Sequence, residues 1–244
     1  MRESISVFFP AYNDEHTIGG LVRETLAFLP ELTDDYEVIG VNDGSRDGTG
    51  AILEQLRSEF PGRFRVVTHQ TNRGYGGALQ SGFAAARKDL VFYTDGDGQY
   101  DPSELRSLLQ LMGPLVGCVN GFKLDRSDPW HRIAIGFLYN KFARFIFAIQ
   151  LRDIDCDFRL IRRSLLEDVA LNCTSGTVCV ELVKKLELCP YLVEEVGVHH
   201  YPRRYGRSQF FRLRSLVTTL FQLLSLYTSL VLLPQVTGRD ARSV

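Results

Sequence analysis

The chain has 244 residues, 45% of them hydrophobic and 23% charged, a balance typical of a globular domain with one large core. Its formal net charge of −1 argues against a general attraction to nucleic acid. Its five cysteines, none in a Cys-x-x-Cys pair, favour a reduced, cytosolic setting over a disulfide framework. The apolar run over residues 5–9 is too short for a signal peptide or a membrane span.

The first hundred residues alternate short apolar runs with longer amphipathic ones. The expected strands are residues 5–9, 36–41, 65–68 and 90–94, and the expected helices are 16–29, 49–60 and 78–87. Asn13 or Asp14 is expected to cap the first helix, and Asp101 and Pro102 to begin a fourth that ends near residue 112. This alternation predicts an α/β fold with a mostly parallel central sheet and flanking helices, with ligand-binding loops at one sheet edge.

Two carboxylates and an amide directly follow the fourth expected strand. Asp95 and Asp97 stand one residue apart, so in an extended segment they point the same way, and Gln99 continues the row. Two anionic oxygens with an amide oxygen suit Mg²⁺ or Mn²⁺, which is usually shared with substrate phosphates. Gly96 lets the backbone and a ligand approach closely. The alternative interpretation is a surface acidic turn.

Polar or glycine-rich segments also follow the second and third expected strands. Asp43 is placed to accept hydrogen bonds from the N–H groups of a nucleobase, or serves only the turn around it. Gly74, Gly76 and Gly77 open a helix after a strand, as in dinucleotide-binding folds. We reject that interpretation because the strand is the third rather than the first. In addition, the acidic position that follows is a doubled Asp loop rather than a single ribose-binding carboxylate.

Taken in order, four motifs resemble those of family 2 glycosyltransferases with the GT-A fold. They are Pro-Ala-Tyr-Asn at 10–13, Asn-Asp-Gly-Ser-Arg-Asp-Gly-Thr at 42–49, Asn-Arg-Gly-Tyr-Gly-Gly-Ala at 72–78 and Asp-Gly-Asp-Gly-Gln at 95–99. The resemblance covers at least residues 4–210. Asn42, where many members carry Asp, is a mild departure that should not affect metal binding.

The resemblance implies a nucleotide-sugar donor. The residues expected to bind it are Pro10, Tyr12, Asn13, Glu15, Asp43, Gly74, Gly77, Asp95 and Gly96. Of these, Asp43 and the loop over residues 11–14 would hold the base. The resemblance also implies that Asp95, Asp97 and Gln99 hold Mg²⁺ or Mn²⁺ on the donor diphosphate.

The second half begins with an expected strand over residues 117–122 and a polar loop that contains Arg126 and Arg132. Residues 133–151 follow, apolar and aromatic at helical spacing. Lys141 and Arg144 interrupt this run, so a membrane span is not expected. The predicted helix is either buried or lies at a membrane interface, with its apolar face toward lipid.

Residues 152–163 are similar to the Asp-Phe-Arg-Leu segment of polyprenyl-phosphate glycosyltransferases, the group that includes dolichyl-phosphate mannose synthases. Within it, Asp157 is expected to act as a general base or to orient the acceptor. The alternative is that Asp157 pairs with a nearby arginine and is structural. Glu181 matches a family glutamate that supports the acceptor loop.

A strand expected over residues 196–201 leads into a segment that resembles the family's Arg-x-x-Gly-x-Ser loop. Arginines in such a loop suit phosphate oxygens, although a solvated basic loop is the alternative. The predicted catalytic residues are Asp97, Asp157, Arg203 and Arg207. The predicted acceptor-phosphate residues are Arg126, Arg132, Arg159 and Ser208. His199 and His200 lack metal-ligand spacing and are expected to pack against the strand.

Residues 215–233 carry no charge, with serine, threonine and glutamine along one helical face and leucine along the other. The pattern predicts an amphipathic helix that lies on a membrane or packs on a partner and stops at Pro234, with a single span as the alternative. The expected domain organisation is therefore a catalytic domain over 1–212, an amphipathic, membrane-associated helix over 213–234 and a disordered tail over 235–244.

Together these features predict a metal-dependent, inverting glycosyltransferase that moves a sugar from a GDP- or UDP-linked donor to a polyprenyl or dolichyl phosphate. We expect it to act peripherally at the cytoplasmic face of a membrane and without nucleic acid. A homo-oligomer or a membrane-protein partner is left open. The alternatives are transfer to a saccharide hydroxyl in cell-surface polysaccharide synthesis and a non-catalytic nucleotide-sugar-binding subunit.

Overall fold

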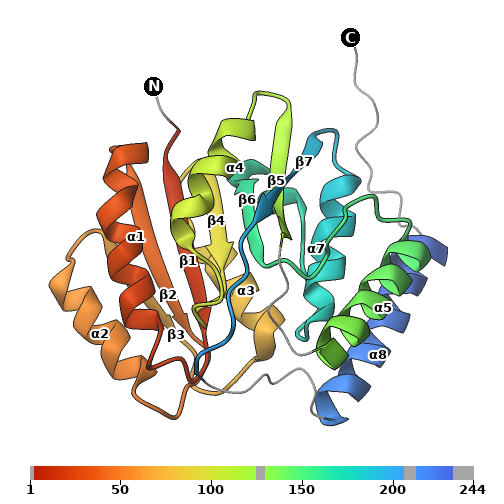
Figure 1. Cartoon of the computed structure of the whole chain (residues 1–244), viewed down its shortest axis with the longest axis horizontal. Coiled ribbons are helices and arrows are strands. Elements are labelled where there is room, and N and C mark those ends of the chain that lie inside the picture. Colours follow the sequence, from red (N-terminus) through yellow and green to blue (C-terminus); the bar gives the residue numbers. More distant parts are fainter. Residues whose placement is uncertain (1–2, 125–129, 206–212, 233–244) are drawn as a thin grey trace.

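A seven-stranded sheet with the order β3-β2-β1-β4-β6-β5-β7 forms the centre of the computed structural model, which describes residues 3–124, 130–205 and 213–232 (Figure 1). The strands are β1 (Ile5–Ala11), β2 (Tyr36–Asn42), β3 (Phe64–Thr68), β4 (Leu90–Thr94), β5 (Val116–Lys123), β6 (Phe158–Arg162) and β7 (Leu192–Val198). The first four are mutually parallel, as predicted, and their carboxyl ends meet at one edge of the sheet.

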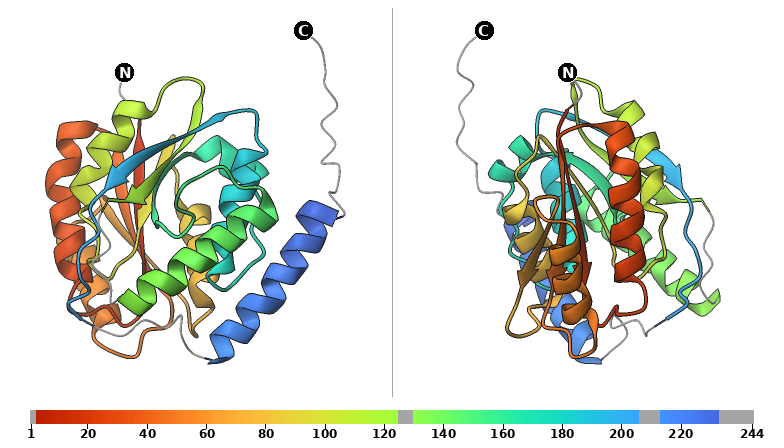
Figure 2. Two further views of the ribbon diagram at one scale, coloured as in Figure 1. Left: turned by 45° about the vertical axis from the view of Figure 1, so that its right-hand side comes forward. Right: turned by 90° about the vertical axis from the view of Figure 1, so that its left-hand side faces the viewer.

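The helices flank this sheet on both faces (Figure 2). They are α1 (Ile18–Leu32), α2 (Thr49–Glu59), α3 (Gly74–Ala85), α4 (Leu105–Leu111), α5 (Trp130–Phe147), α6 (Arg163–Asp168), α7 (Thr177–Glu187) and α8 (Leu213–Tyr227), with the short turns η1 (Pro102–Glu104) and η2 (Thr228–Leu232). The side chain of Asp101 accepts a hydrogen bond from the Ser103 N–H at the start of η1, which confirms its predicted capping role.

Strand β6 is not among the elements expected from the sequence, because Arg159 and Arg162 interrupt its apolar residues. It lies between β4 and β5 and is antiparallel to both. Its first residue, Phe158, therefore pairs with the last residue of β4, Thr94. This insertion brings the residue before β6 to the edge where the β4 loop begins.

Two helix starts differ from the expectation. Helix α3 begins at Gly74 rather than at residue 78, so the glycine-rich segment forms its first turn. Helix α1 begins at Ile18, after Thr17, and no side chain caps it. The prediction that Asn13 or Asp14 caps α1 is therefore wrong for the side chains. The backbone carbonyl of Asp14, instead, accepts from the N–H groups of Thr17 and Ile18.

The core is divided between the two faces of the sheet. Along β1, Val7 and Phe9 point to the face covered by α1, α2 and α4, whereas Phe8 points to the face covered by α3, α5, α7 and α8. This follows from the two-residue period of a strand. Both faces are buried, which explains why the central strands read as continuous apolar runs rather than alternating ones.

Helices α5 and α8 lie side by side outside α7 and expose much of their apolar surface (Figures 1 and 2). Ala143 and Phe147 of α5 and Leu226 of α8 reach the core. The exposed apolar side chains of the pair are Ile135, Phe137, Leu138, Phe142, Phe145, Leu220, Phe221 and Leu224. In the described parts of the chain, no helix combines the length and apolarity needed to cross a bilayer.

Candidate active site

Four carboxylates and one arginine gather where the carboxyl ends of the parallel strands meet the start of β6. Asp14 comes from the loop after β1, and Asp95 and Asp97 from the loop after β4. Asp157 stands one residue before β6, next to the end of β4 in the antiparallel pairing. Arg203 reaches the same place from the segment after β7 and contacts Asp97. The arrangement follows directly from the sheet order.

The loop after β4 holds its side chains in defined contacts. Asp95 Oδ1 accepts from the hydroxyl of Tyr75 at 2.8 Å. Asp97 Oδ1 accepts from the Gln99 N–H at 3.0 Å, and Asp97 Oδ2 accepts from Arg203 Nη2. Gln99 Oε1 accepts from Arg203 Nε at 3.1 Å. The predicted trio therefore lies together, with Arg203 as its cation.

The pKa values of three of these carboxyls are raised. Burial, followed by the charges of Asp157 and Asp97, raises the pKa of Asp95 well above its usual range. Burial raises the pKa of Asp97, although the nearby charge of Arg203 opposes it. The pKa of Asp14 is raised to about 6, again mainly by burial. Burial thus disfavours the ionised form of these carboxylates, and repulsion between neighbouring carboxylates adds to it.

The donor set fits a divalent cation of the predicted kind. Mg²⁺ and Mn²⁺ take oxygen ligands and are commonly held by one or two carboxylates together with substrate phosphates. Asp95 and Asp97 provide such carboxylates, and a cation between them would relieve their repulsion. Within the described residues, no group of three or more His, Cys, Asp or Glu side chains is arranged to hold a metal without a substrate.

The side chain of Asp157 is held in place by the buried Arg159. Arg159 is fully buried, and its Nη1 donates to Asp157 Oδ1 at 3.0 Å and also to the Tyr93 hydroxyl. Its Nε donates to Asn120 Oδ1 at 2.6 Å, and its Nη2 donates to the Ile154 carbonyl. All three nitrogens of Arg159 thus donate to protein groups, so in this structure Arg159 supports Asp157 rather than making the predicted contact with the acceptor phosphate.

Cys179, on α7, completes the support of Asp157. Its Sγ lies 3.2 Å from Asp157 Oδ1, so that this oxygen receives two donors while the side chain keeps 14% of its surface exposed. Burial and the neighbouring Asp157 charge raise the pKa of the Cys179 thiol well above its usual range. The thiol is therefore protonated and acts as a donor. Only the apolar run around residue 179 could have pointed to this contact from the sequence.

Asp43, predicted to hold the base, lies buried at the end of β2. Its Oδ1 accepts from the Arg73 N–H at 2.8 Å and lies 2.6 Å from Nδ1 of His69. Its backbone carbonyl accepts from the Asn72 side chain. His69 follows β3 directly, and it was not predicted as a site residue. The signal that could have found it is a histidine at the carboxyl end of a strand next to the Asp43 strand.

The loop after β1 is fixed largely by contacts to the residues before α2. Asn13, at φ 58°, accepts from the Arg46 N–H through Oδ1, and Glu15 accepts from the Gly48 N–H through Oε2. Asp14 Oδ2 accepts from the Tyr12 N–H at 2.8 Å. Asn13 and Glu15, both predicted to bind the donor, thus use these oxygens to shape the loop.

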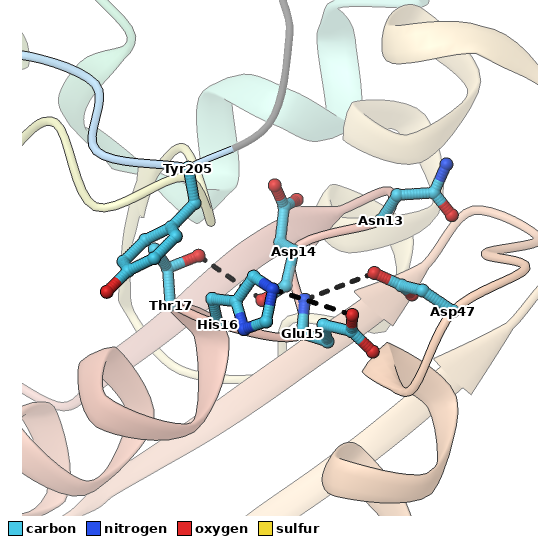
Figure 3. A pocket seen from close by; sticks show the side chains of 7 residues that line it. All are labelled: Asn13, Asp14, Glu15, His16, Thr17, Asp47 and Tyr205. Atoms are coloured by element: carbon cyan, nitrogen blue, oxygen red, sulfur yellow. Dashed lines mark hydrogen bonds and ion pairs between the residues drawn. The ribbon is translucent and has the colours of Figure 1, made fainter.

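A cavity of about 220 Å³ opens beside this loop (Figure 3). It is lined by Asn13, Asp14, Glu15, His16, Thr17, Asp47 and Tyr205. Figure 3 shows the rings of His16 and Tyr205 on one side, with centroids 4.9 Å apart. Because Tyr205 follows Arg203 closely, the cavity joins the loop after β1 to the segment that contacts Asp97.

The predicted glycines are explained by close packing. A Cβ on Gly74, which has φ 82°, would lie 2.5 Å from the Thr174 carbonyl oxygen, and one on Gly76 would overlap the Cys173 carbonyl. A Cβ on Gly96 would lie 2.9 Å from the Pro10 carbonyl, which accepts from the Gly96 N–H.

Gly77 packs in the same way, since a Cβ there would lie 2.7 Å from Cβ of Arg73. At the glycine-rich turn, these packing requirements account for the glycines without a bound donor.

Residues 172–176, which we call the bridging loop, connect the glycine-rich turn of α3 to α8. Glu181 accepts from the N–H groups of Asn172 and Cys173, which fits its predicted supporting role. The Thr174 carbonyl accepts from the Gly76 N–H. On the other side, Gln222 of α8 accepts from the N–H and hydroxyl of Ser175 and donates to Thr174. Gln222 of α8 therefore faces the protein together with Leu226, whereas Leu220 and Leu224 are exposed.

Several predicted positions have no described side chain. Arg126, Arg207 and Ser208 lie outside the described residues, and so does the tail over residues 235–244. The backbone of Arg132 belongs to α5, but its side chain is not described. His200 is buried against Gln99 at 3.3 Å, as strand packing predicts, whereas the His199 side chain is 56% exposed and contacts Glu104.

Comparison with known families decides the class of this protein. The model of the glycosyl transferase family 2 matches residues 6–170. The chain belongs to glycosyltransferase family 2. The predicted family is thereby confirmed, and the protein is a glycosyltransferase. Its polar edge, with Asp43, Asp95 and Asp97, lies within the matched residues.

Two curated relatives of the transferase carry the same description. An undecaprenyl-phosphate 4-deoxy-4-formamido-L-arabinose transferase of Enterobacter sp. (strain 638) is 28% identical over 239 residues, which cover 93% of this chain and 72% of that one. The protein of the same description from Pseudomonas fluorescens (strain SBW25) is 28% identical over 225 residues, which cover 92% of this chain and 65% of that one.

Solved structures confirm the predicted GT-A fold. Glucosyl-3-phosphoglycerate synthase from Mycobacterium tuberculosis, in complex with Mn²⁺, UDP and glucosyl-3-phosphoglycerate, superposes with a TM-score of 0.71. The identity is 20%, and the match covers 96% of this chain and 82% of that one. The same enzyme with Mg²⁺ and UDP gives a TM-score of 0.69. At this identity the likeness concerns the fold.

Proposed function

We propose that the transferase moves a sugar from a GDP- or UDP-linked donor to a polyprenyl phosphate, at the cytosolic face of a membrane, with Mg²⁺ or Mn²⁺ and with inversion at the anomeric carbon. The observation that carries the proposal is the buried carboxylate cluster of Asp95, Asp97 and Asp157, paired with Arg203 at the sheet edge. The printed description of the relatives, which names undecaprenyl phosphate, supports the acceptor class.

The donor site is assigned to the edge formed by β1, β2 and β4. Asp43 would accept from the base, and Tyr12 lies in the loop next to it. Pro10 and Gly96, joined by a backbone hydrogen bond, would lie along the donor, while Gly74 and Gly77 shape the neighbouring turn. Asp95, Asp97 and Gln99 would hold the divalent cation. When bound, that cation would neutralise the charge that develops on the departing diphosphate.

The acceptor side requires little base catalysis. A phosphate monoester has its second pKa near ~6, so it is already a largely ionised nucleophile at neutral pH. What it needs is alignment against the negative donor. Arg203 supplies a cation at Asp97, and Arg126, Arg132, Arg207 and Ser208 are proposed to add to it. Asp157, with Oδ1 fixed by Arg159 and Cys179, would orient the reacting groups.

The exposed faces of α5 and α8 are assigned to the membrane surface. Their exposed side chains include Phe145 at 83% and Phe221 at 68% relative exposure, on neighbouring helices. Large apolar patches on a soluble surface mark interaction sites, and an acceptor with a lipid tail resides in a bilayer. We keep the predicted division into a catalytic domain over 1–212 and a membrane-associated helix over 213–234.

The first test is transfer of label from a panel of radiolabelled nucleotide sugars to a short polyprenyl phosphate, with and without Mn²⁺ or Mg²⁺. We expect metal-dependent movement of label into the organic phase with one donor. Asp97→Asn should lower turnover by roughly a hundredfold or more at saturating metal, because the cation loses a carboxylate. Full turnover of Asp97→Asn would contradict the proposed metal site.

A second candidate is transfer to a saccharide hydroxyl, and the position of Asp157 favours it. Asp157 lies beside Asp95 with part of its carboxylate exposed, as a general base would. A hydroxyl acceptor has a pKa far above 7 and needs such a base. Asp157→Asn with donor binding retained but turnover lost would favour this candidate. Unlabelled lipid in the panel assay, despite donor hydrolysis, would favour it too.

A further inference from the structure

Asp43, the carboxylate proposed to bind the nucleobase, contacts His69, and His69 in turn contacts Ser81. Neither His69 nor Ser81 belongs to the family motifs. His69 Nδ1 lies 2.6 Å from Asp43 Oδ1, and His69 Nε2 lies 2.9 Å from the hydroxyl of Ser81. Asp43 is 3% exposed and His69 is 8% exposed. Water therefore has little access to these contacts, and the three side chains form one buried row.

The fold places this row at the same sheet edge as the site. Strands β2 and β3 are parallel, with Asn42 paired to Thr68, so Asp43 and His69 both come one residue after a paired position. The His69 N–H donates to the Asn42 carbonyl at 2.9 Å and continues the ladder. Ser81 belongs to α3, which covers this face of the sheet. Three elements thus fix the imidazole.

The contacts determine where the proton lies. A carboxylate oxygen only accepts, so the proton of a neutral imidazole is on Nδ1, directed at Asp43. Nε2 is then an acceptor, and the hydroxyl of Ser81 donates to it. Oδ1 of Asp43 thereby receives two donors, from His69 and from the Arg73 N–H. Oδ2 accepts no hydrogen bond from residues 3–124, 130–205 or 213–232.

We propose that His69, with Ser81 behind it, is a positioning residue that presents Oδ2 of Asp43 as a fixed acceptor and so selects the nucleobase of the donor. The inference rests on the proposed role of Asp43. An acceptor at this point matches a ring N–H, which uracil and guanine have. Cytosine and adenine carry a bare ring nitrogen at the equivalent edge and would leave Oδ2 facing another acceptor.

The test is calorimetric binding of UDP, GDP, CDP and ADP, each with Mn²⁺, to the full chain and to variants. For His69→Ala we expect the Kd of the preferred diphosphate to rise about tenfold, because a buried carboxylate loses a donor. We also expect its preference over CDP and ADP to fall. His69→Asn, which keeps an N–H near the Nδ1 position, should restore much of the selectivity. Ser81→Ala should produce a smaller loss in the same direction.

The selectivity ratio, which is the Kd for CDP or ADP divided by the Kd for the preferred diphosphate, separates a positioning role of His69 from a merely structural one. A structural defect would weaken all four diphosphates equally, which would overturn the proposal, as would an unchanged Kd and selectivity in His69→Ala. If His69→Ala does not fold, Ser81→Ala and His69→Asn decide by the same ratio. Thr68→Ala, exposed on the same strand, is the matched control and should bind as the unaltered chain does. Failure of the unaltered chain to bind any diphosphate would instead contradict the proposed function.

Discussion

The two halves of the transferase treat their apolar residues in opposite ways. Over residues 3–124, apolar side chains fill both faces of a parallel sheet, and the polar loops meet at its edge. Over 130–232, two long helices turn phenylalanine and leucine outward, while polar Gln222 and Thr219 face the protein. The first half buries its apolar residues, in part against α5, α7 and α8 of the second half. The second half also leaves apolar side chains of α5 and α8 exposed.

The largest effect we expect comes from the arginine that lies between the halves. Arg159→Leu should lower the free energy of unfolding by about 3–5 kcal/mol, because it leaves buried partners of a charged group unpaired. Chemical denaturation followed by circular dichroism measures it. Arg163→Leu removes a surface ion pair with Glu167 and should change stability by less than about 1 kcal/mol. Equal effects of the two substitutions would show that the buried network does not join the halves.

A second substitution tests the contact between the glycine-rich turn and the bridging loop. Gly76→Ala would drive a methyl group into the Cys173 carbonyl, and we expect a loss of about 1–3 kcal/mol, or a fall in Tm of roughly 2–12 °C. Gly20→Ala is the control, because a Cβ there meets nothing within 4 Å. That change in a helix interior should leave Tm unchanged or raise it. A harmless Gly76→Ala would mean that the two segments are not in close contact.

The smallest effect concerns the exposed helical surface. Phe142→Ser combined with Phe145→Ser should lower partition onto anionic lipid vesicles by about tenfold, or about 1.4 kcal/mol, because two partly inserted rings contribute less than the roughly 1.5–3 kcal/mol of one fully buried phenylalanine. Tm and nucleotide binding should not change, because both rings are exposed. Leu115→Ser, at an exposed position away from α5 and α8, serves as control in a sedimentation assay. If Leu115→Ser loses as much vesicle binding as the double phenylalanine variant, the exposed surface of α5 and α8 has no special affinity for lipid.

The sequence was most informative where one strand or one motif decides the structure. The parallel strands and the β4 loop with Asp95 and Asp97 follow from local patterns. Strand β6 was missed because Arg159 within it looked like a surface or ligand-binding residue, and only the buried partners Tyr93 and Asn120 make it a core residue. Local patterns cannot supply such partners.

The same limit explains the functional residues that were missed. His69 and Cys179 act through side chains 26 and 22 positions away, across strands whose neighbours the sequence did not specify. The polar face of the last helix was predicted, but its partner was not. Gln222 binds the bridging loop, 47 positions away, so α8 packs with Gln222 and Leu226 toward the protein and leaves Leu220 and Leu224 exposed.

The bridging loop also gives the molecule a built-in reporter. The amide proton of Ser175 is protected only by the side-chain oxygen of Gln222, a residue of the last helix, among the partners that the described chain offers it. Its exchange with deuterated solvent therefore measures how often α8 separates from the rest of the protein. The amide of Gly76, bonded to the Thr174 carbonyl on the other side of the loop, measures instead how often the loop separates from α3. The two exchange rates would thus distinguish release of the last helix from release of the bridging loop without any added label.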